Sequence, residues 1–356
     1  MSLISVCIIT KNESANLKRC LSALSAYPFE IIVTDTGSTD DSIEVARKFT
    51  PHVYEFAWIQ DFSAARNFCI SKAGSKWILS LDTDEFIEEI DFDALTQLLD
   101  SNPYGIGSIL LYSPDCSGQI TVERVDRLFQ KKYYHFERPV HEQLVRNATE
   151  NKIVAKESTG NFFEVPIKAL HTGYSGQVIP LAEKAQRDLD ILLSHADTLS
   201  DAYSHFQIGQ CYYMMQQYEN AVSYFEKAFS YPLDTDADFV SYLITGYGYS
   251  LYHLGQTKLA ITNLIPLEGH FANHADIEFL FGFLYMELGN YLQAGLHYIK
   301  ATSCTKYKIL GTNSFLSYYN LGILYEMLGD KKLAIAFHQK AGDYEKSKER
   351  LAALLQ

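Results

Sequence analysis

One spacing recurs four times in the C-terminal half of the chain and strongly restricts how that half can fold. Each copy has a glycine twelve residues before an alanine, with an aromatic or aliphatic residue three positions after the glycine. The glycines are 39, 34 and 40 residues apart: Gly209, Gly248, Gly282 and Gly322, followed by Ala221, Ala260, Ala294 and Ala334. Small side chains at these points let two antiparallel helices approach closely, so the pattern predicts a stack of helix pairs.

The spacing resembles the tetratricopeptide repeat, whose period is about 34 residues. We expect an all-α solenoid of four tetratricopeptide-like repeats over residues 201–342, followed by a capping helix over residues 343–356. Residues 179–200 are expected to form a linker helix. An unrelated helical bundle is the alternative. The resemblance implies a concave surface that holds an extended peptide, and a homodimer formed through the repeats is a second use of the same helices.

Residues 1–178 follow a different pattern, in which short β-rich runs alternate with helical stretches. This alternation predicts right-handed crossovers and a mostly parallel sheet, which makes the N-terminal part a Rossmann-like α/β domain. The strands are apolar on both faces, as expected when helices cover both sides of the sheet. Strands are expected within residues 3–10, 29–38, 53–58 and 76–82, and helices within residues 14–27, 40–49 and 63–73.

Three carboxylates follow the apolar run of residues 77–82. Asp82, Asp84 and Glu85 would repel one another, and each is costly to remove from water. Hard divalent cations such as Mn²⁺ or Mg²⁺ prefer oxygen ligands and also bridge phosphates, so the cluster favours a metal ion with a nucleotide partner. The alternative is that this D-x-D sequence only decorates a turn.

Other polar residues follow the first two strands and are therefore expected at the same edge of the sheet. The first strand is followed by "TKNES" and the second by "TDTGSTDDS", where Gly37 lets the backbone approach a base and ribose. Ser38 is instead a helix cap in the alternative interpretation. Arg66 and Asn67 are expected at the start of a helix, near enough to reach a diphosphate, and Arg66 has the forked donors that suit it.

Together, "IITKNE", "VTDTGSTDDS", "DFSAARN" and "LDTDEF" make residues 1 to about 175 resemble the family 2 glycosyltransferases of the GT-A fold. The resemblance implies a nucleoside-diphosphate sugar as donor and inversion at the anomeric carbon. It also implies that Asp35 bonds the base, Arg66 contacts the diphosphate and Asp84 binds the metal ion. The expected nucleotide-sugar-binding residues are Thr10, Asn12, Glu13, Asp35, Gly37, Ser38, Arg66, Asp82, Thr83 and Arg127.

A second resemblance rests on "RVDRLFQKKYYHFERPVHEQL", on "ALHTGY" and on the repeats that follow them. These features are similar to bacterial peptide glycosyltransferases of the sublancin S-glycosyltransferase type. The similarity implies transfer of a hexose from a UDP-sugar, with UDP-glucose as the expected donor, to serine or cysteine side chains of a peptide such as a bacteriocin precursor. His171 is then a metal ligand beside Asp84; its alternative role is structural hydrogen bonding. Arg124 and Arg127 are expected to face the diphosphate, or instead to pair with Glu123 and Asp126.

The catalytic base is open, because the "ED" pair and the "QxxRW" motif of many family 2 members are missing from this sequence. "RPVHEQL" occupies the comparable place. Glu142 is the first candidate, His141 the second and Glu85 the third. A serine acceptor needs such a base, whereas a cysteine thiol is intrinsically nucleophilic and needs less help.

Composition excludes some partners. The net charge of −13, from 43 acidic and 30 basic residues, disfavours nucleic acid. No apolar run approaches the roughly 18 residues of a membrane helix, and we expect neither an integral membrane segment nor a signal peptide. Six scattered cysteines are expected to be reduced thiols in a cytoplasmic protein. Two rival functions remain: transfer to a cell-envelope glycan or lipid-linked acceptor, and a non-catalytic repeat scaffold.

Overall fold

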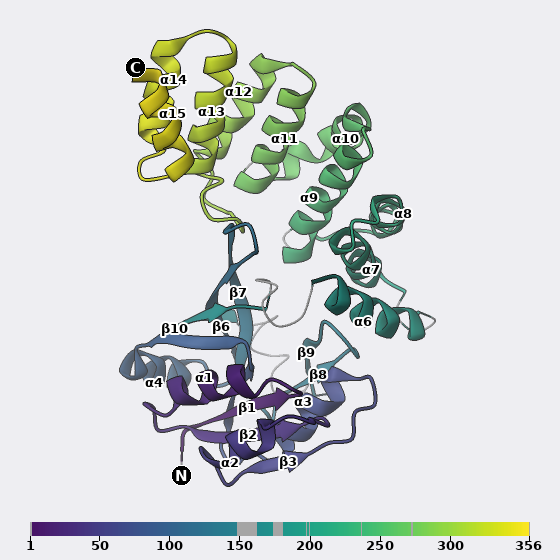
Figure 1. The fold of residues 1–356 in the computed structure, drawn as a ribbon. Helices are drawn as coiled ribbons and strands as arrows, with labels where there is room; N and C mark the ends of the chain where they lie inside the picture. Colours follow the sequence, from purple (N-terminus) through teal and green to yellow (C-terminus); the bar gives the residue numbers. More distant parts are fainter. Residues whose placement is uncertain are drawn as a thin grey trace. The chain divides into compact units, whose positions relative to one another are not determined.

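The computed structural model describes residues 2–147, 162–173, 181–196, 198, 200–235, 237–271 and 273–355. The chain divides into two compact units, Met1–Pro180 and Leu181–Gln356 (Figure 1). The expected boundary between residues 178 and 179 lies outside the described residues. No helix within the described ranges is long and apolar enough to cross a membrane.

An eight-stranded sheet forms the centre of the first unit, in the order β3-β2-β1-β4-β7-β6-β10-β5. Neighbouring strands are parallel from β3 to β4, and β10 is parallel to β6, whereas β7 and β5 run antiparallel to their neighbours. The sheet is therefore mixed, because a short turn after β6 returns the chain directly as β7. The strands are β1 (Ile4–Thr10), β2 (Glu30–Asp35), β3 (Val53–Glu55), β4 (Trp77–Asp82), β5 (Glu85–Ile90), β6 (Ile106–Pro114), β7 (Ile120–Gln130) and β10 (Phe162–His171).

Alternating side chains of the parallel strands enter two separate cores, since successive residues of a strand point to opposite faces. In β1, Val6 and Ile8 join the core that contains Leu17 of α1, while Cys7 joins the core that contains Cys69 of α3. Helices thus cover both faces, which explains why these strands are apolar throughout. The helices are α1 (Ser14–Leu24), α2 (Ser42–Arg47), α3 (Phe62–Ser71) and α4 (Phe92–Ser101), and a small separate sheet pairs β8 (Tyr134–Glu137) with β9 (Gln143–Arg146).

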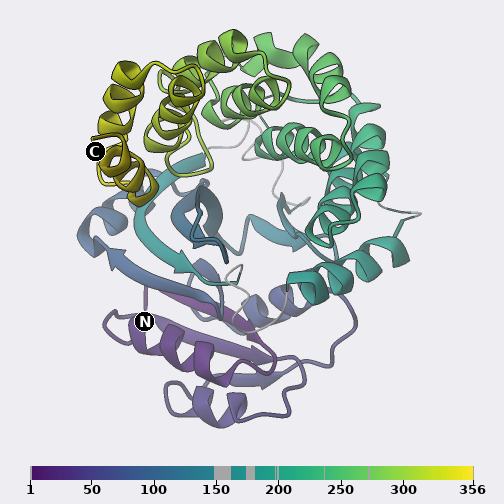
Figure 2. The same cartoon turned by 45° about the horizontal axis from the view of Figure 1, so that its top comes forward.

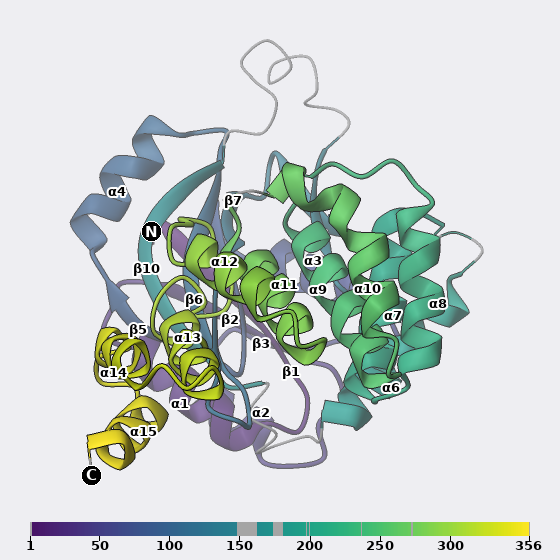
Figure 3. The same ribbon diagram turned by 90° about the horizontal axis from the view of Figure 1, so that it is seen from above.

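Helices alone build the described part of the second unit, and successive pairs of them stack along the chain (Figure 2 and Figure 3). The recurring glycines lie where the two helices of a pair meet: a Cβ on Gly209 would come within 2.5 Å of the Phe225 ring. The helices are α6 (Leu181–Ser194), α7 (Ala202–Met214), α8 (Tyr218–Phe229), α9 (Asp238–His253), α10 (Thr257–Leu264), η2 (Ile265–Phe271), α11 (Ala275–Glu287), α12 (Tyr291–Ala301), α13 (Phe315–Met327), α14 (Lys331–Lys340) and α15 (Glu345–Leu355).

Candidate functional site

Two oxygen atoms at the carboxyl ends of β1 and β2 are buried without a hydrogen-bond partner among the described residues: Thr10 Oγ1 and Asp35 Oδ1. Thr10 and Asp35 are direct neighbours in the parallel register, so both atoms lie at one edge of the sheet. The other carboxylate oxygen, Asp35 Oδ2, accepts bonds from the backbone N–H groups of Gly37 and Ser38, each at 2.9 Å. Because buried polar atoms are normally paired, the two unpaired oxygens indicate a binding site.

The loops after β1 and β2 hold each other in place. The Asn12 N–H donates to Ser38 Oγ at 2.9 Å, and Asn12 Oδ1 accepts from the Thr39 N–H at 2.7 Å. Asn12 has a left-handed backbone, with φ of 55°, and Gly37 has φ of 103°, which favours glycine there. The structure therefore uses the Asn12 and Ser38 side chains to join the two loops beside Asp35.

Glu13 and Thr83 meet although 70 residues separate them in the sequence, since the Thr83 hydroxyl donates to Glu13 Oε2. Burial raises the pKa of Glu13, and the charge of Asp84 adds to this effect. The contact brings the loop after β1 against the turn after β4. Both residues were predicted to bind the nucleotide sugar, and the structure places them together at this edge.

Arg66 connects three segments of the first unit. Its guanidinium is buried and donates to Asp82 Oδ1 at 2.7 Å, to Glu142 Oε1 at 2.7 Å and to Ser80 Oγ at 3.3 Å. The next residue, Asn67, bonds both backbone groups of Phe136, at 2.8 and 3.0 Å. Helix α3 thereby holds the segment that carries Glu142 against the end of β4.

Arg127 explains how the carboxylates after β4 remain close together. From β7, its Nη2 donates to Asp82 Oδ2 at 3.1 Å and to Glu85 Oε1, while Glu85 Oε2 accepts the Asp82 N–H at 3.1 Å. Burial alone would raise the pKa of Asp82, but the charges of Arg66 and Arg127 outweigh burial and hold that pKa below its usual range. Burial raises the pKa of Glu85. The two arginines thus compensate carboxylates that would otherwise repel one another.

Asp84 and His171 come together through the pairing of β5 with β10. This antiparallel register places His171 opposite Glu85, so that His171 Nε2 lies 3.4 Å from Asp84 Oδ2. The Thr172 N–H also donates to the Asp84 carbonyl at 3.1 Å. A Cβ on Gly173 would collide with both Asp84 Oδ2 and His171 Nε2, so only glycine fits beside this pair without displacing it.

This donor set fits a divalent cation. Carboxylate oxygen suits Mn²⁺ and Mg²⁺, imidazole nitrogen is tolerated by Mn²⁺, and the remaining positions suit water and phosphate oxygens. A group of three possible ligand residues occurs elsewhere in the described chain. There, Glu268, Glu278 and His297 have ligand atoms within 4.8 Å of one another. There, however, the Lys300 ammonium lies 2.5 Å from Glu268 Oε1 and already supplies the positive charge. Asp84 and His171 are therefore the better candidate ligands.

The three candidate bases differ in accessibility. The Glu85 side chain is 2% exposed and both of its oxygens are bonded, whereas the Glu142 side chain is 12% exposed and, among the described residues, bonds only Arg66, through Oε1. His141 is half-buried beside Glu142 and has a left-handed backbone, with φ of 54°. Glu142 is thus the candidate whose carboxylate best combines a fixed position with access to an acceptor.

Some placements differ from the sequence-based interpretation. Arg124 pairs with Glu164 at 2.6 Å on an exposed surface, and Asp126 accepts a bond from Ser108 Oγ. One contributor carried no recognisable signal in the sequence. Ser113 Oγ lies 3.1 Å from His171 Nδ1, but nothing in "YSPD" marks that serine. Asn67 was expected near a diphosphate, yet its amide bonds the main chain of Phe136.

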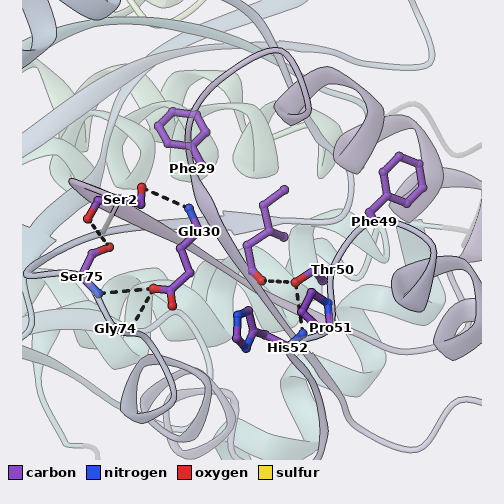
Figure 4. A pocket seen from close by; sticks show the side chains of 10 residues that line it. Ser2, Phe29, Glu30, Phe49, Thr50, Pro51, His52, Gly74 and Ser75 are labelled. Carbon is purple, nitrogen blue, oxygen red and sulfur yellow. Dashed lines mark hydrogen bonds between the residues drawn. The ribbon is translucent and has the colours of Figure 1, made fainter.

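A cavity of 590 Å³ lies at a different edge of the sheet, where β2 begins (Figure 4). Its most polar group is Glu30, whose Oε2 accepts the N–H groups of Gly74 at 2.7 Å and Ser75 at 3.3 Å. The Ser5 hydroxyl also donates to Oε2, and this bond, followed by the two backbone bonds, lowers the pKa of Glu30 despite the opposing effect of burial. The carboxylate is thus satisfied within the chain, and the cavity lies apart from the unpaired oxygens of Thr10 and Asp35.

Comparison with known proteins relates this site to a family. Residues 5–153 match Glycosyl transferase family 2, and residues 202–231 match a tetratricopeptide repeat. A TPR repeat-containing protein of Synechococcus elongatus is 31% identical over 59% of this chain and 52% of its own length. An uncharacterized glycosyltransferase of Rickettsia prowazekii is 28% identical over 50% of this chain and 62% of its own.

The SPbeta prophage-derived glycosyltransferase SunS of Bacillus subtilis is 26% identical over 62% of this chain and 52% of its own length. The chain thus spans about half to three fifths of the lengths of these relatives. The predicted fold class, an α/β nucleotide-sugar domain of the GT-A type followed by an all-α repeat region, is confirmed. Residues 5–153 thus match a family 2 glycosyltransferase domain that contains the candidate site residues other than His171, and residues 202–231 match a tetratricopeptide repeat.

Proposed function

We propose that this chain is an inverting, metal-dependent glycosyltransferase that moves a hexose from a UDP-sugar, with UDP-glucose as the favoured donor, to a serine or cysteine side chain of a peptide. The observation that carries the proposal is the group of side chains where the strands of the sheet end. Among the described residues it combines the unpaired, buried Asp35 Oδ1, the buried Arg66, the half-buried Arg127 and the Asp84–His171 pair. Ligands of open α/β sheets bind at the carboxyl ends of the strands, where this group lies.

Donor binding follows from the unpaired acceptor. A uracil imide N–H would supply the hydrogen bond that Asp35 Oδ1 lacks, and Thr10 Oγ1 lies at the same register position. The loops joined by Asn12 and Ser38 keep Asp35 in place before the ligand arrives. A site prepared in this way loses less conformational freedom on binding.

The leaving diphosphate needs positive charge. When bound, Mn²⁺ or Mg²⁺ would supply Lewis-acid stabilisation to its oxygens, and Asp84 and His171 would hold that ion. Arg66 and Arg127 hold Asp82 ionised and oriented at the end of β4. Because these charges are in place beforehand, they cost no reorganisation as the bond to the anomeric carbon breaks.

We favour Glu142 as the base that accepts the proton of a serine acceptor. Arg66 fixes its Oε1 at 2.7 Å, and Oε2 is left for the proton. His141 stays the second candidate. Glu85 is the weakest of the three, because Arg127 and the Asp82 N–H occupy both of its oxygens. A cysteine acceptor depends less on this base, since a free thiol ionises at about pH 8.5 and is intrinsically nucleophilic.

The repeats supply the surface for a peptide acceptor. We call the first helix of each pair, namely α7, α9, α11 and α13, an inner helix. None of these described helices contains a lysine or arginine. Instead they carry half-buried aromatic side chains such as Tyr249, Tyr252 and Phe283, whose ring centroids lie 4.7 to 5.6 Å apart. Such a surface favours apolar and aromatic peptide side chains over acidic ones. The likeness to SunS supports a peptide acceptor, and free thiols support a cytoplasmic location.

Other acceptors remain as rivals. A cell-envelope or lipid-linked acceptor would use the same donor site, so acceptor chemistry decides between them. A non-catalytic scaffold is disfavoured, because the family match covers the candidate site residues from Thr10 to Glu142, though not His171, and the charged groups among them are intact. A homodimer through the repeats stays a prediction that sedimentation would check.

Intact-mass measurement tests the proposed reaction. The full chain would be incubated with serine- and cysteine-containing peptides, Mn²⁺ and a panel of UDP-sugars. We expect a mass increase of one hexose with UDP-glucose, and loss of the product in EDTA or in Asp84→Ala. Transfer that is unchanged in Asp84→Ala with EDTA would contradict the metal role. Absence of transfer to every peptide, with transfer to a glycan or lipid acceptor, would contradict the peptide assignment.

A further inference from the structure

We propose that Ser113 is a positioning residue that selects Nε2 of His171 as the metal-binding nitrogen. The inference deepens the proposed function and rests on the metal role of Asp84 and His171. Ser113 touches neither substrate nor ion in this proposal. It acts through the imidazole, by accepting the proton of Nδ1 when Nε2 binds the cation.

The sheet places the three side chains in a row across neighbouring strands. Strand β10 lies between β6 and β5. On one side, β10 is parallel to β6 with Leu170 opposite Tyr112, so Ser113 and His171 come next in the register. On the other side, β5 places Glu85 opposite His171, with Asp84 directly before it. Strand pairing, rather than a mobile loop, therefore determines this arrangement.

The distances between Ser113, His171 and Asp84, and the burial of Ser113 and His171, support this arrangement. Ser113 is 2% exposed and His171 is 9% exposed. The distance from Ser113 Oγ to His171 Nδ1 is 3.1 Å, and the distance from His171 Nε2 to Asp84 Oδ2 is 3.4 Å. The imidazole thus has one nitrogen directed at Ser113 and the other at Asp84. In a buried place, the loss of an acceptor for an imidazole N–H is unfavourable.

A hydroxyl suits this position because it can both donate and accept a hydrogen bond. Without a cation, the Asp84 carboxylate favours a proton on Nε2, and the Ser113 hydroxyl donates to Nδ1. With a cation bound by Nε2, the proton resides on Nδ1 and Ser113 accepts it. An alanine would remove the Ser113 acceptor from the Nδ1 proton in the bound state, which penalises metal binding. Partners of this kind typically change metal affinity by about 10–100-fold.

Mn²⁺ titration of the full chain, followed by the EPR signal of the free ion, tests the affinity. We expect Ser113→Ala to bind Mn²⁺ about 10–100-fold more weakly than the wild type, and Ser113→Thr, which keeps the hydroxyl, to restore most of the affinity. The matched control is Ser108→Ala. Ser108 is a second buried serine on β6, and its Oγ donates to Asp126 rather than to a candidate ligand. Its loss should leave Mn²⁺ affinity unchanged.

The nitrogen-15 spectrum of the histidine rings tests the tautomer directly, with diamagnetic Mg²⁺ and with His171→Gln to assign the signal. We expect Mg²⁺ to shift His171 toward the Nδ1-protonated form in the wild type, and less so in Ser113→Ala. Wild-type Mn²⁺ affinity in Ser113→Ala, or equal weakening in Ser113→Thr, would overturn the role of Ser113. Undiminished Mn²⁺ binding in both Asp84→Asn and His171→Gln would instead overturn the metal site itself.

Discussion

Asp35 shows how one residue can reveal a site without any ligand. Its Oδ2 is satisfied by two backbone N–H groups, while its Oδ1 is buried and unpaired among the described residues. A buried acceptor without a partner costs about 1–3 kcal/mol. The sequence predicted the contact with a base only through a resemblance. The unpaired atom supports the same role on physical grounds.

We expect Asp35→Asn to weaken UDP binding by about 2 kcal/mol, or roughly 30-fold, because the amide cannot serve both the loop and the imide as the carboxylate can. Calorimetric titration with UDP would measure the change. Asp41→Asn is the matched control, since Asp41 lies exposed on the same loop and makes no side-chain cap bond to α2. Equal affinity of the two variants would show that Asp35 does not contact the base.

At the scale of elements, buried charge pairs join a helix and two strands. Arg66 of α3 and Arg127 of β7 both bond Asp82, the last residue of β4. Periodicity located α3 and β4, because contiguous residues determine it, whereas no strand was predicted over the residues of β7. It did not reveal that β7 would run antiparallel beside β4, and this neighbour supplies the charge that Asp82 and Glu85 require. Pairing of β7 depends on residues about 50 positions away in the sequence.

Two arginines of β7 allow a matched comparison of burial. We expect Arg127→Met to destabilise the first unit by about 3–5 kcal/mol, because it leaves Glu85 buried without its partner. Arg124→Met should cost at most about 1 kcal/mol, since the Arg124–Glu164 pair is exposed. Urea unfolding would measure both values. Similar values for the two variants would contradict the assigned role of burial.

The loss of stability in Arg127→Met should depend on pH. Burial raises the pKa of Glu85 in the folded state, so the folded protein holds this proton more tightly than the unfolded chain does. Stability contributed by Glu85 therefore falls as pH rises from its unfolded pKa through its folded pKa. Without Arg127, we expect the loss of stability to be greater at pH 8 than at pH 5. Urea unfolding at the two pH values would check this, and a larger loss at pH 5 would contradict it.

For the whole molecule, the two units have hydrophobic cores that share no residue. Leu17 and Leu79 belong to the core of the first unit, and Phe225 and Leu280 to that of the second. The candidate donor site lies within the first unit, whereas the aromatic inner helices lie within the second. A chain of this kind need not unfold in a single transition.

Ligand binding should distinguish the two units in calorimetry. UDP with Mn²⁺ at about 100 times their dissociation constant should stabilise the first unit by about 2.7 kcal/mol, because only the folded site binds them. We expect one transition to move to higher temperature and the transition of the repeats to stay unchanged. The control is Asp35→Asn, in which the shift should shrink. A shift confined to the repeat transition would place the donor site elsewhere.

The sequence by itself determined the local elements of this protein: the strands and helices before residue 83, the helix pairs marked by Gly209 and its equivalents, and the polar segments that follow each strand. These features depend on neighbouring residues, whose spacing decides which face of an element is apolar. The tertiary structure alone decided the partners. Ser113, His171 and Asp84 stand in a row because β6, β10 and β5 pair in one register. Strand pairing brings together residues far apart in the chain, and no local pattern records which strands will be neighbours.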